Sequence, residues 1–177
     1  MKGKPIVFAA IVAAIFLAAP ATLHAIPDTI RQAMRNAPAD AVVGMGSARM
    51  RTTALSQTTA EARARAEIAR TLDSVVRSMI LDFQRDSEID PSQALAITEA
   101  VTTVLAASRL QGAQVVERAI DANGEFWVLI VLPRQNAATE IATASSSAAT
   151  SPTVNIPGFQ EAMGAVDRMN RAFAEAN

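Results

Sequence analysis

The side chains available for chemistry are carboxylates, arginines and hydroxyls, because the 177-residue chain has no cysteine and one histidine. That histidine, His24, lies in an N-terminal segment that we expect to be removed. The remaining chain then lacks the usual ligands of zinc and haem, and a serine nucleophile lacks its histidine base. We therefore predict no catalytic residues, no metal and no cofactor, and we interpret the protein as not being an enzyme.

Two short patterns invite a functional interpretation, and neither is specific. Asp86, Glu88 and Asp90 lie together between two predicted helices. A solvated helix boundary is the simpler interpretation, and a weak calcium site is the alternative, although the spacing is not that of an EF-hand. The run Gly44-Met45-Gly46 lacks the third glycine of a dinucleotide fingerprint and the lysine of a P-loop.

Three residues in the two predicted strands over residues 114–132 are candidates for contact with a ligand. Trp127 is the single tryptophan, in a chain without tyrosine, and it lies in an apolar stretch. Packing in a core or an interface is therefore the favoured interpretation, and a ligand platform is the alternative. Glu117 and Arg118 lie in the middle of a strand, where an exposed sheet face is favoured over a pocket.

Residues 1–25 have the pattern of a secretory signal peptide. Two lysines precede an apolar run from Pro5 to Ala19, and the small residues after it allow cleavage after Ala21 or Ala25. The run is shorter than the roughly twenty residues that cross a bilayer, so an uncleaved anchor is the less favoured alternative. We predict export to the periplasm and no stable membrane anchor after cleavage.

The chain beyond the signal peptide is mildly acidic. Removing both lysines from the 16 basic residues leaves 14 arginines against 17 acidic residues, a net charge of −3. No large basic field results, so we predict no nucleic-acid partner. About 150 residues suffice to bury one core without disulfides.

The spacing of apolar residues predicts one α+β domain over residues 26–134. We expect a three-stranded, mainly antiparallel sheet packed against a long two-helix hairpin, in the order β-α-α-β-β. The expected elements are a short helix before Pro38, a strand over 41–49, a helix over about 53–84, a helix opened by Asp90-Pro91, and strands over 114–120 and 125–132. Asn123-Gly124 is the hairpin signal between the last two strands, and the final strand is apolar on both faces.

Small residues predict one unusually close contact. Gly44 and Gly46 lie inside the first strand, where glycine marks a bulge or the close approach of another backbone. Ala62, Ala66 and Ala69 recur at helical spacing in the first half of the long helix. We expect these alanines on its inner face, where another element can pack closely.

The C-terminal part of the chain is predicted to be a linker followed by a helix. Residues 135–157 are rich in Ser, Thr, Ala and Pro, a composition typical of linkers. Residues 158–177 form a predicted amphipathic helix that either folds back on the domain or docks on a partner. The candidate interaction residues are Trp127 and the apolar side of this helix, which comprises Phe159, Met163, Val166, Met169 and Phe173.

Several motifs occur in the order seen in one envelope family. They are Ile26-Pro27-Asp28, a Val-Gly-x-Gly-x-Ala strand from Val43 to Ala48, a long Ala/Arg/Glu helix, a Ser/Thr-bearing helix, Gly112 to Glu117, and an Asn-Gly hairpin before an aromatic-aliphatic strand. Residues 26–134 resemble the Lpp-twenty lipoprotein family, which includes FlgP-type flagellar assembly proteins; the periplasmic SIMPL-type domain is an alternative. The resemblance implies an α+β sandwich, oligomers, an envelope location and no established enzymatic activity. The family's lipid-attachment cysteine is missing, which puts membrane anchoring in doubt.

These observations lead to two hypotheses about function. The first is a non-enzymatic exported protein that self-assembles as a scaffold or accessory component of an envelope structure, with flagellar association as one form. It predicts a homo-oligomer and an envelope protein partner on the C-terminal helix. The alternative is a periplasmic module that binds a small ligand or peptide on the open face of the sheet or beside Trp127.

Overall fold

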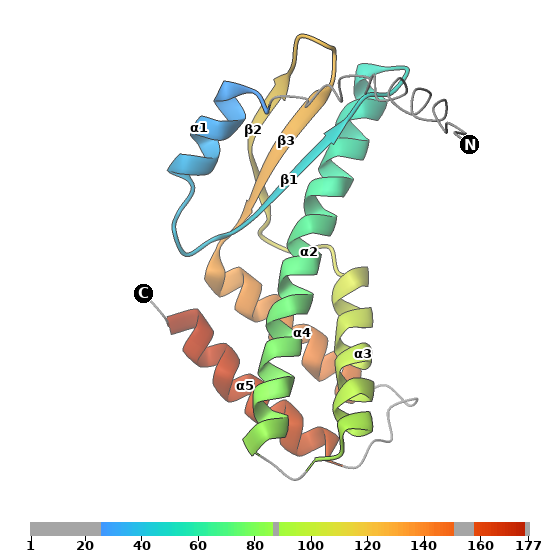
Figure 1. Cartoon of the computed structure of the whole chain (residues 1–177), viewed down its shortest axis with the longest axis vertical. Coiled ribbons are helices and arrows are strands. Elements are labelled where there is room, and N and C mark those ends of the chain that lie inside the picture. Colours follow the sequence, from blue (N-terminus) through green and yellow to red (C-terminus); the bar gives the residue numbers. More distant parts are fainter. Residues whose placement is uncertain (1–25, 87–88, 151–157, 176–177) are drawn as a thin grey trace, which may run out of the picture.

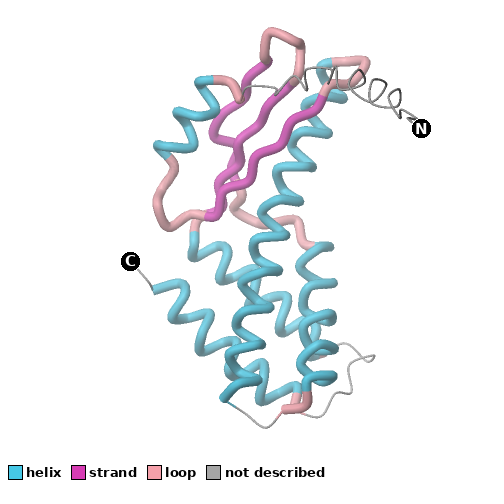
Figure 2. The backbone as a smooth tube through the Cα atoms, viewed as in Figure 1, coloured by secondary structure: helices cyan, strands magenta, loops and turns pink. Residues whose placement is uncertain are grey.

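The computed structural model describes residues 26–86, 89–150 and 158–175, so the predicted signal peptide lies outside the described residues. A three-stranded antiparallel sheet in the order β1-β3-β2 occupies one end of an elongated molecule, and helices alone form the other end (Figures 1 and 2). The elements are α1 (Asp28–Asn36), β1 (Val42–Ala48), α2 (Thr53–Asp86), α3 (Pro91–Ala107), β2 (Gln114–Ile120), β3 (Phe126–Leu132), α4 (Arg134–Ala149) and α5 (Phe159–Glu175). The predicted α+β class and antiparallel sheet are confirmed.

β1 lies directly on the backbone of α2 because two of its inward positions are glycine. A Cβ atom at Gly44 would lie 2.2 Å from the carbonyl oxygen of Ala64, and one at Gly46 would lie 2.1 Å from the carbonyl oxygen of Ala60. No side chain fits at such distances. Ala60 and Ala64 are themselves fully buried. The close approach of another backbone, predicted from these glycines, is confirmed.

The alanines of α2 that face the sheet differ from those predicted. Ala60 and Ala64 are buried, whereas Ala62 and Ala66 are exposed and Ala69 is partly buried. The prediction of the inner face was wrong because alanines occur on several sides of this half of the helix. Alanine spacing alone therefore does not show which side of α2 faces the sheet. That side is the one that contacts Gly44 and Gly46 of β1.

The second half of α2 extends beyond the sheet and packs in a helical bundle. Its buried side chains are Leu72, Val76, Met79 and Ile80, and they share one core with Ile97, Val101 and Leu105 of α3, Ile141 of α4, and Phe159 and Val166 of α5. The same core continues to the inner face of the sheet through Val128 and Ile130 of β3. α2 therefore joins the two ends of the molecule.

α4 corrects the prediction of a linker. Arg134–Ala149 is a helix, although its composition predicted a linker over residues 135–157. Its buried positions are Ala137, Ala138, Glu140, Ile141, Ala144, Ser145 and Ala148. Small side chains at helical spacing allow neighbouring helices to approach closely, so burial does not require large apolar residues here. The linker prediction is wrong for residues 135–149, and residues 151–157 lie outside the described residues.

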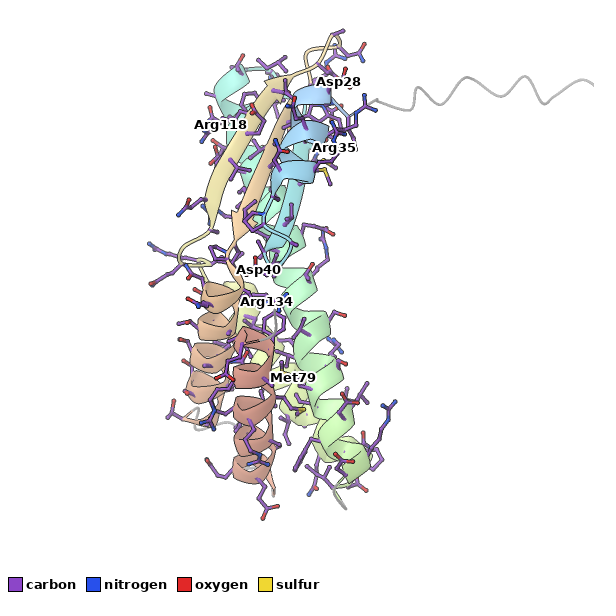
Figure 3. The ribbon with its side chains drawn as sticks, turned by 90° about the vertical axis from the view of Figure 1, so that its left-hand side faces the viewer. Asp28, Arg35, Asp40, Met79, Arg118 and Arg134 are labelled. Atoms are coloured by element: carbon purple, nitrogen blue, oxygen red, sulfur yellow. The ribbon has the colours of Figure 1, made fainter. Side chains whose placement is uncertain are left out.

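α5 packs on its own chain, against α4 and α2. Its apolar side faces the core: Phe159, Met163 and Val166 are buried, and Met169 and Phe173 are partly buried. The guanidinium of Arg134 lies over the ring of Phe173, 5.4 Å from its centre. The Nε of Arg134 also donates to the carbonyl of Asp40 at 3.1 Å, near the junction of sheet and bundle (Figure 3). The sequence left open whether this helix folds back on its own domain or docks on a partner, and in the structure it folds back.

The β2–β3 hairpin contains the predicted Asn-Gly turn. The Oδ1 of Asp121 accepts the backbone N–H groups of Asn123 at 2.8 Å and Glu125 at 2.9 Å. Gly124 has a φ of 78°, which glycine adopts without strain. Donation from Glu125, followed by that from Asn123, lowers the pKa of the Asp121 carboxyl group.

The contact between β1 and α2 can be tested with one matched pair of substitutions. We expect Gly46→Ala to lower the free energy of unfolding by ~1–3 kcal/mol or more, because the new methyl group has no room. Gly164→Ala makes the same chemical change on α5, where the nearest atom is the Nη1 of Arg168 at 3.7 Å. It should raise stability by roughly 0.5–1 kcal/mol. Urea unfolding followed by circular dichroism measures both, and equal stabilities would contradict the close contact.

Candidate functional site

Trp127 lies in the smaller of two apolar clusters, beneath α1. It is 6% exposed and packs with Ile30 and Leu129. α1 covers the outer face of the sheet, which the sequence hypothesis had left open to a ligand (Figure 1). Trp127 therefore packs in the core, and a ligand could reach it only if α1 moved away.

β2 forms one edge of the sheet and is its most exposed strand. Its residues alternate between exposed and partly buried, whereas every residue of β3 is buried. Val116 is 47% exposed and Ile120 is 57% exposed. A β-bulge between Val115 and Glu117 interrupts the pairing with β3. β2 thus combines exposed apolar side chains with the unpaired backbone groups of an edge strand.

The opposite edge of the sheet is partly closed by α2. The Nη1 of Arg63 donates to the carbonyl of Ser47 on β1 at 2.6 Å. A side chain that occupies an edge carbonyl competes with any strand that would pair there. β2 is therefore the edge better placed to accept another strand.

Arg118 lies on an exposed part of β2, as the favoured interpretation predicted (Figure 3). Its Nη2 is 3.2 Å from the Oε1 of Glu61 on α2. The same oxygen accepts from the side-chain amide of Gln57 at 3.0 Å. The hydrogen bond from Gln57, and then the contact with Arg118, lower the pKa of Glu61 below its ordinary value of 4.5. Glu117 instead lines a hollow between α1 and β2.

A groove of about 610 Å³ lies between the end of α3 and α4, and we call it the α3–α4 groove. Its lining residues are Val104, Ala107, Ser108, Arg109, Gln111, Gly112, Asn136, Thr139, Glu140 and Thr143. Glu140 is 9% exposed, and its Oε1 accepts the backbone N–H of Gln111 at 2.6 Å. The carboxylate thus joins α4 to the loop that follows α3.

The loop over residues 108–113 is held from two sides. Leu110 has a φ of 50° and Gly112 a φ of 81°, so the chain turns sharply here. Asn136 of α4 packs against Gly112 so closely that a Cβ atom there would lie 1.7 Å from its Nδ2. From α2, the Nη1 of Arg65 donates to the carbonyl of Arg109 at 3.2 Å. The groove is therefore built on fixed backbone.

Sequence reasoning missed this groove because it treated α4 as a linker. One signal was available. Glu140 is the single charged residue in the stretch 135–157, which is otherwise Ser, Thr, Ala and other uncharged residues. In the structure this single charge has a specific partner, the backbone N–H of Gln111.

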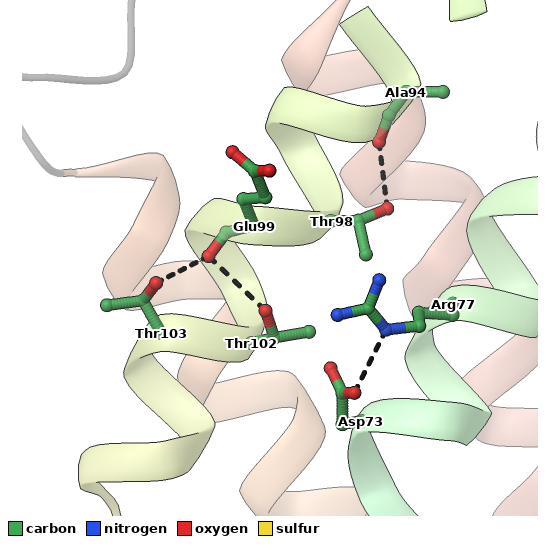
Figure 4. Close-up of polar contacts among 7 residues, drawn as sticks. All are labelled: Asp73, Arg77, Ala94, Thr98, Glu99, Thr102 and Thr103. Carbon is green, nitrogen blue, oxygen red and sulfur yellow. Dashed lines mark hydrogen bonds and ion pairs between the residues drawn. The ribbon is translucent and has the colours of Figure 1, made fainter. Parts of the chain in front are cut away.

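A second hollow, of about 390 Å³, lies between α2 and α3. Asp73 and Arg77 form an ion pair there at 2.9 Å, and Asp73 raises the pKa of Arg77 (Figure 4). Nearby hydroxyl groups donate to carbonyls of their own helix: Thr98 to Ala94, and Thr102 and Thr103 to Glu99. Thr102, which lines the hollow, thus has a partner in its own helix, whereas the buried Oδ1 of Asp73 has no hydrogen-bond partner in the described part of the chain.

The acidic residues between α2 and α3 have a structural role at one position. Asp90 caps α3, accepting the backbone N–H of Ser92 at 2.8 Å, as its place before Pro91 predicted. Glu88 lies outside the described residues. Within residues 26–86, 89–150 and 158–175, no group of three or more His, Cys, Asp or Glu could hold a metal ion. No helix in these ranges has the length and hydropathy needed to cross a bilayer.

Comparison of the chain with protein-family models gives no match, and the curated proteins include no significantly similar sequence. The resemblance to the Lpp-twenty family therefore stays a prediction from motifs. The β2 edge and the α3–α4 groove are the two surfaces of the described residues whose geometry bears on function.

The Glu61–Arg118 pair predicts a specific pH dependence of stability. Because the folded state lowers the pKa of Glu61, its stabilisation is present above the ordinary pKa of 4.5 and is lost as pH falls through the folded value. We expect Glu61→Gln to cost ~0.2–1 kcal/mol at neutral pH, the range of exposed pairs, and progressively less as pH falls below 4.5. Urea unfolding over a series of pH values from neutral downwards measures this. Glu99→Gln, on the exposed side of α3, is the control, and identical pH profiles for both variants would contradict the prediction.

Proposed function

We propose that the protein is a non-enzymatic exported component of the cell envelope that acts by self-assembly, and that copies associate through the edge of β2. The observation that carries this proposal is the exposure of Val116 and Ile120 on an edge strand beside a fully buried β3. A second copy brings the same edge, so two copies can pair their β2 strands symmetrically and extend the sheet.

The basis of this proposal differs from the one that the sequence suggested. β3 is covered by α1 and α2, the small residues of α2 meet glycines of β1, and α5 packs on α4. These three features need no second chain. Deletion of α5 and the end of α4 would be a poor test of assembly, because it would remove Ala144, Ala148 and Phe159 from the core. Point substitutions on β2 are the cleaner experiment.

The cellular setting is proposed from the sequence alone. The signal-peptide pattern over residues 1–25 supports export to the periplasm. The motif resemblance supports a role as a scaffold or accessory protein, with flagellar association as one form. An additional envelope partner on α5 is less supported, because its apolar side chains already contact the core.

The second candidate function is a module that binds a small ligand or peptide. The buried carboxylate of Glu140 in the α3–α4 groove favours it. A concave site of a few hundred Å³ with a few convergent polar groups is typical of small-molecule sites.

Self-assembly through β2 can be tested by placing a charge on the edge. We expect Ile120→Lys to weaken self-association at least tenfold, because a lysine on an edge strand opposes pairing with another strand. Leu81→Lys is the matched control, since Leu81 is a similarly exposed leucine on α2, far from β2 in the chain. Sedimentation velocity over a range of concentrations measures the association constant. Equal effects of the two substitutions, or none from Ile120→Lys, would overturn the proposal.

A further inference from the structure

We propose that the α3–α4 groove binds a small zwitterionic ligand, with a primary ammonium group at Glu140 and an anionic group at Arg109. This inference depends on the second candidate function and is independent of assembly through β2. It follows from three features of the groove: a buried carboxylate, the C-terminal end of α3, and an arginine on the connecting loop.

Glu140 supplies a carboxylate that its surroundings satisfy only in part. It is more than nine-tenths buried, and it lines the groove. In the described part of the chain its one hydrogen bond is from the Gln111 N–H to Oε1. A carboxylate accepts several hydrogen bonds through two oxygens, so Oε2 remains available. A cation in the groove can therefore pair with this largely buried carboxylate at its free oxygen.

The end of α3 adds negative potential to the same groove. α3 ends at Ala107, which lines the groove together with Val104 and Ser108. The last carbonyl groups of a helix lack partners within it and carry partial negative charge. The last turn of α3 contains no basic residue, and Arg109 follows two residues after the end of the helix. An ammonium group, with three N–H donors, can bond to Glu140 and to carbonyl oxygens at once.

Arg109 places a positive charge on the lining of the groove. It is exposed, and its carbonyl is held by Arg65. Among the described residues its guanidinium forms no ion pair with Glu140 or with any other acid. Two opposite charges that line one groove without pairing suit a ligand that carries both signs. The guanidinium fork is well shaped for a carboxylate.

The proposal can be tested on the full chain with three probes that share a four-carbon chain. 4-Aminobutyrate carries both charges, butylammonium only the positive one, and butyrate only the negative one. We expect binding to decrease in that order, with no detectable binding of butyrate. Isothermal titration calorimetry gives the affinities, and chemical-shift changes at the backbone amides of Gln111 and Thr143 locate the site in the unsubstituted protein.

Substitutions then separate the two charges. Glu140→Gln keeps an oxygen for the Gln111 N–H but removes the charge, so both ammonium probes should bind at least tenfold more weakly. Arg109→Ala should reduce the affinity for 4-aminobutyrate to that for butylammonium. Glu99→Gln, on another side of α3, should bind as the parent does. Absence of shift changes with both ammonium probes, or binding unchanged by Glu140→Gln, would overturn the proposal. Sedimentation of the same samples reports self-association separately.

Discussion

The contact between β1 and α2 determines where the other elements lie. With glycine at positions 44 and 46, the strand backbone rests against Ala60 and Ala64, so sheet and helix are closer than any larger side chain would allow. This contact holds the first half of α2 along the sheet. The second half then extends beyond the ends of the strands, where its larger apolar residues must be covered by other helices. α3, α4 and α5 provide that cover, and the groove between α3 and α4 is a consequence of how they pack.

Local chemistry explains why most of the elements could be predicted from the sequence. Asp90 accepts a backbone N–H at the start of α3, and Pro91 suits the first position of that helix. Asp121 and Gly124 form the hairpin turn, and the apolar β3 requires cover on both faces. Each of these signals depends on neighbours in the chain. Glycines in β1 also predicted a close approach, although they did not identify the residues that face them.

Long-range packing explains what the sequence did not reveal. The buried face of α2 depends on which alanines meet Gly44 and Gly46, which is a tertiary choice among similar residues. α4 was missed because its composition, rich in alanine, serine and threonine, is also that of a linker. Only its contacts with neighbouring helices distinguish the two. The groove was lost with it, since Glu140 gains its role from a backbone N–H 29 residues away in the chain. Of the candidate interaction residues, Trp127 and those of α5 proved to pack within the chain.

In the structure the apolar sides of β3 and α5 are covered within one chain, whereas the edge of β2 is not. Amide hydrogen exchange at low and high protein concentration tests most directly whether copies associate through β2, because association protects the backbone groups that it buries. The account predicts that exchange slows with concentration in β2 (Gln114–Ile120) and is unchanged in α5 (Phe159–Glu175). Protection that rises in α5 but not in β2, or in neither, would contradict self-assembly through the β2 edge.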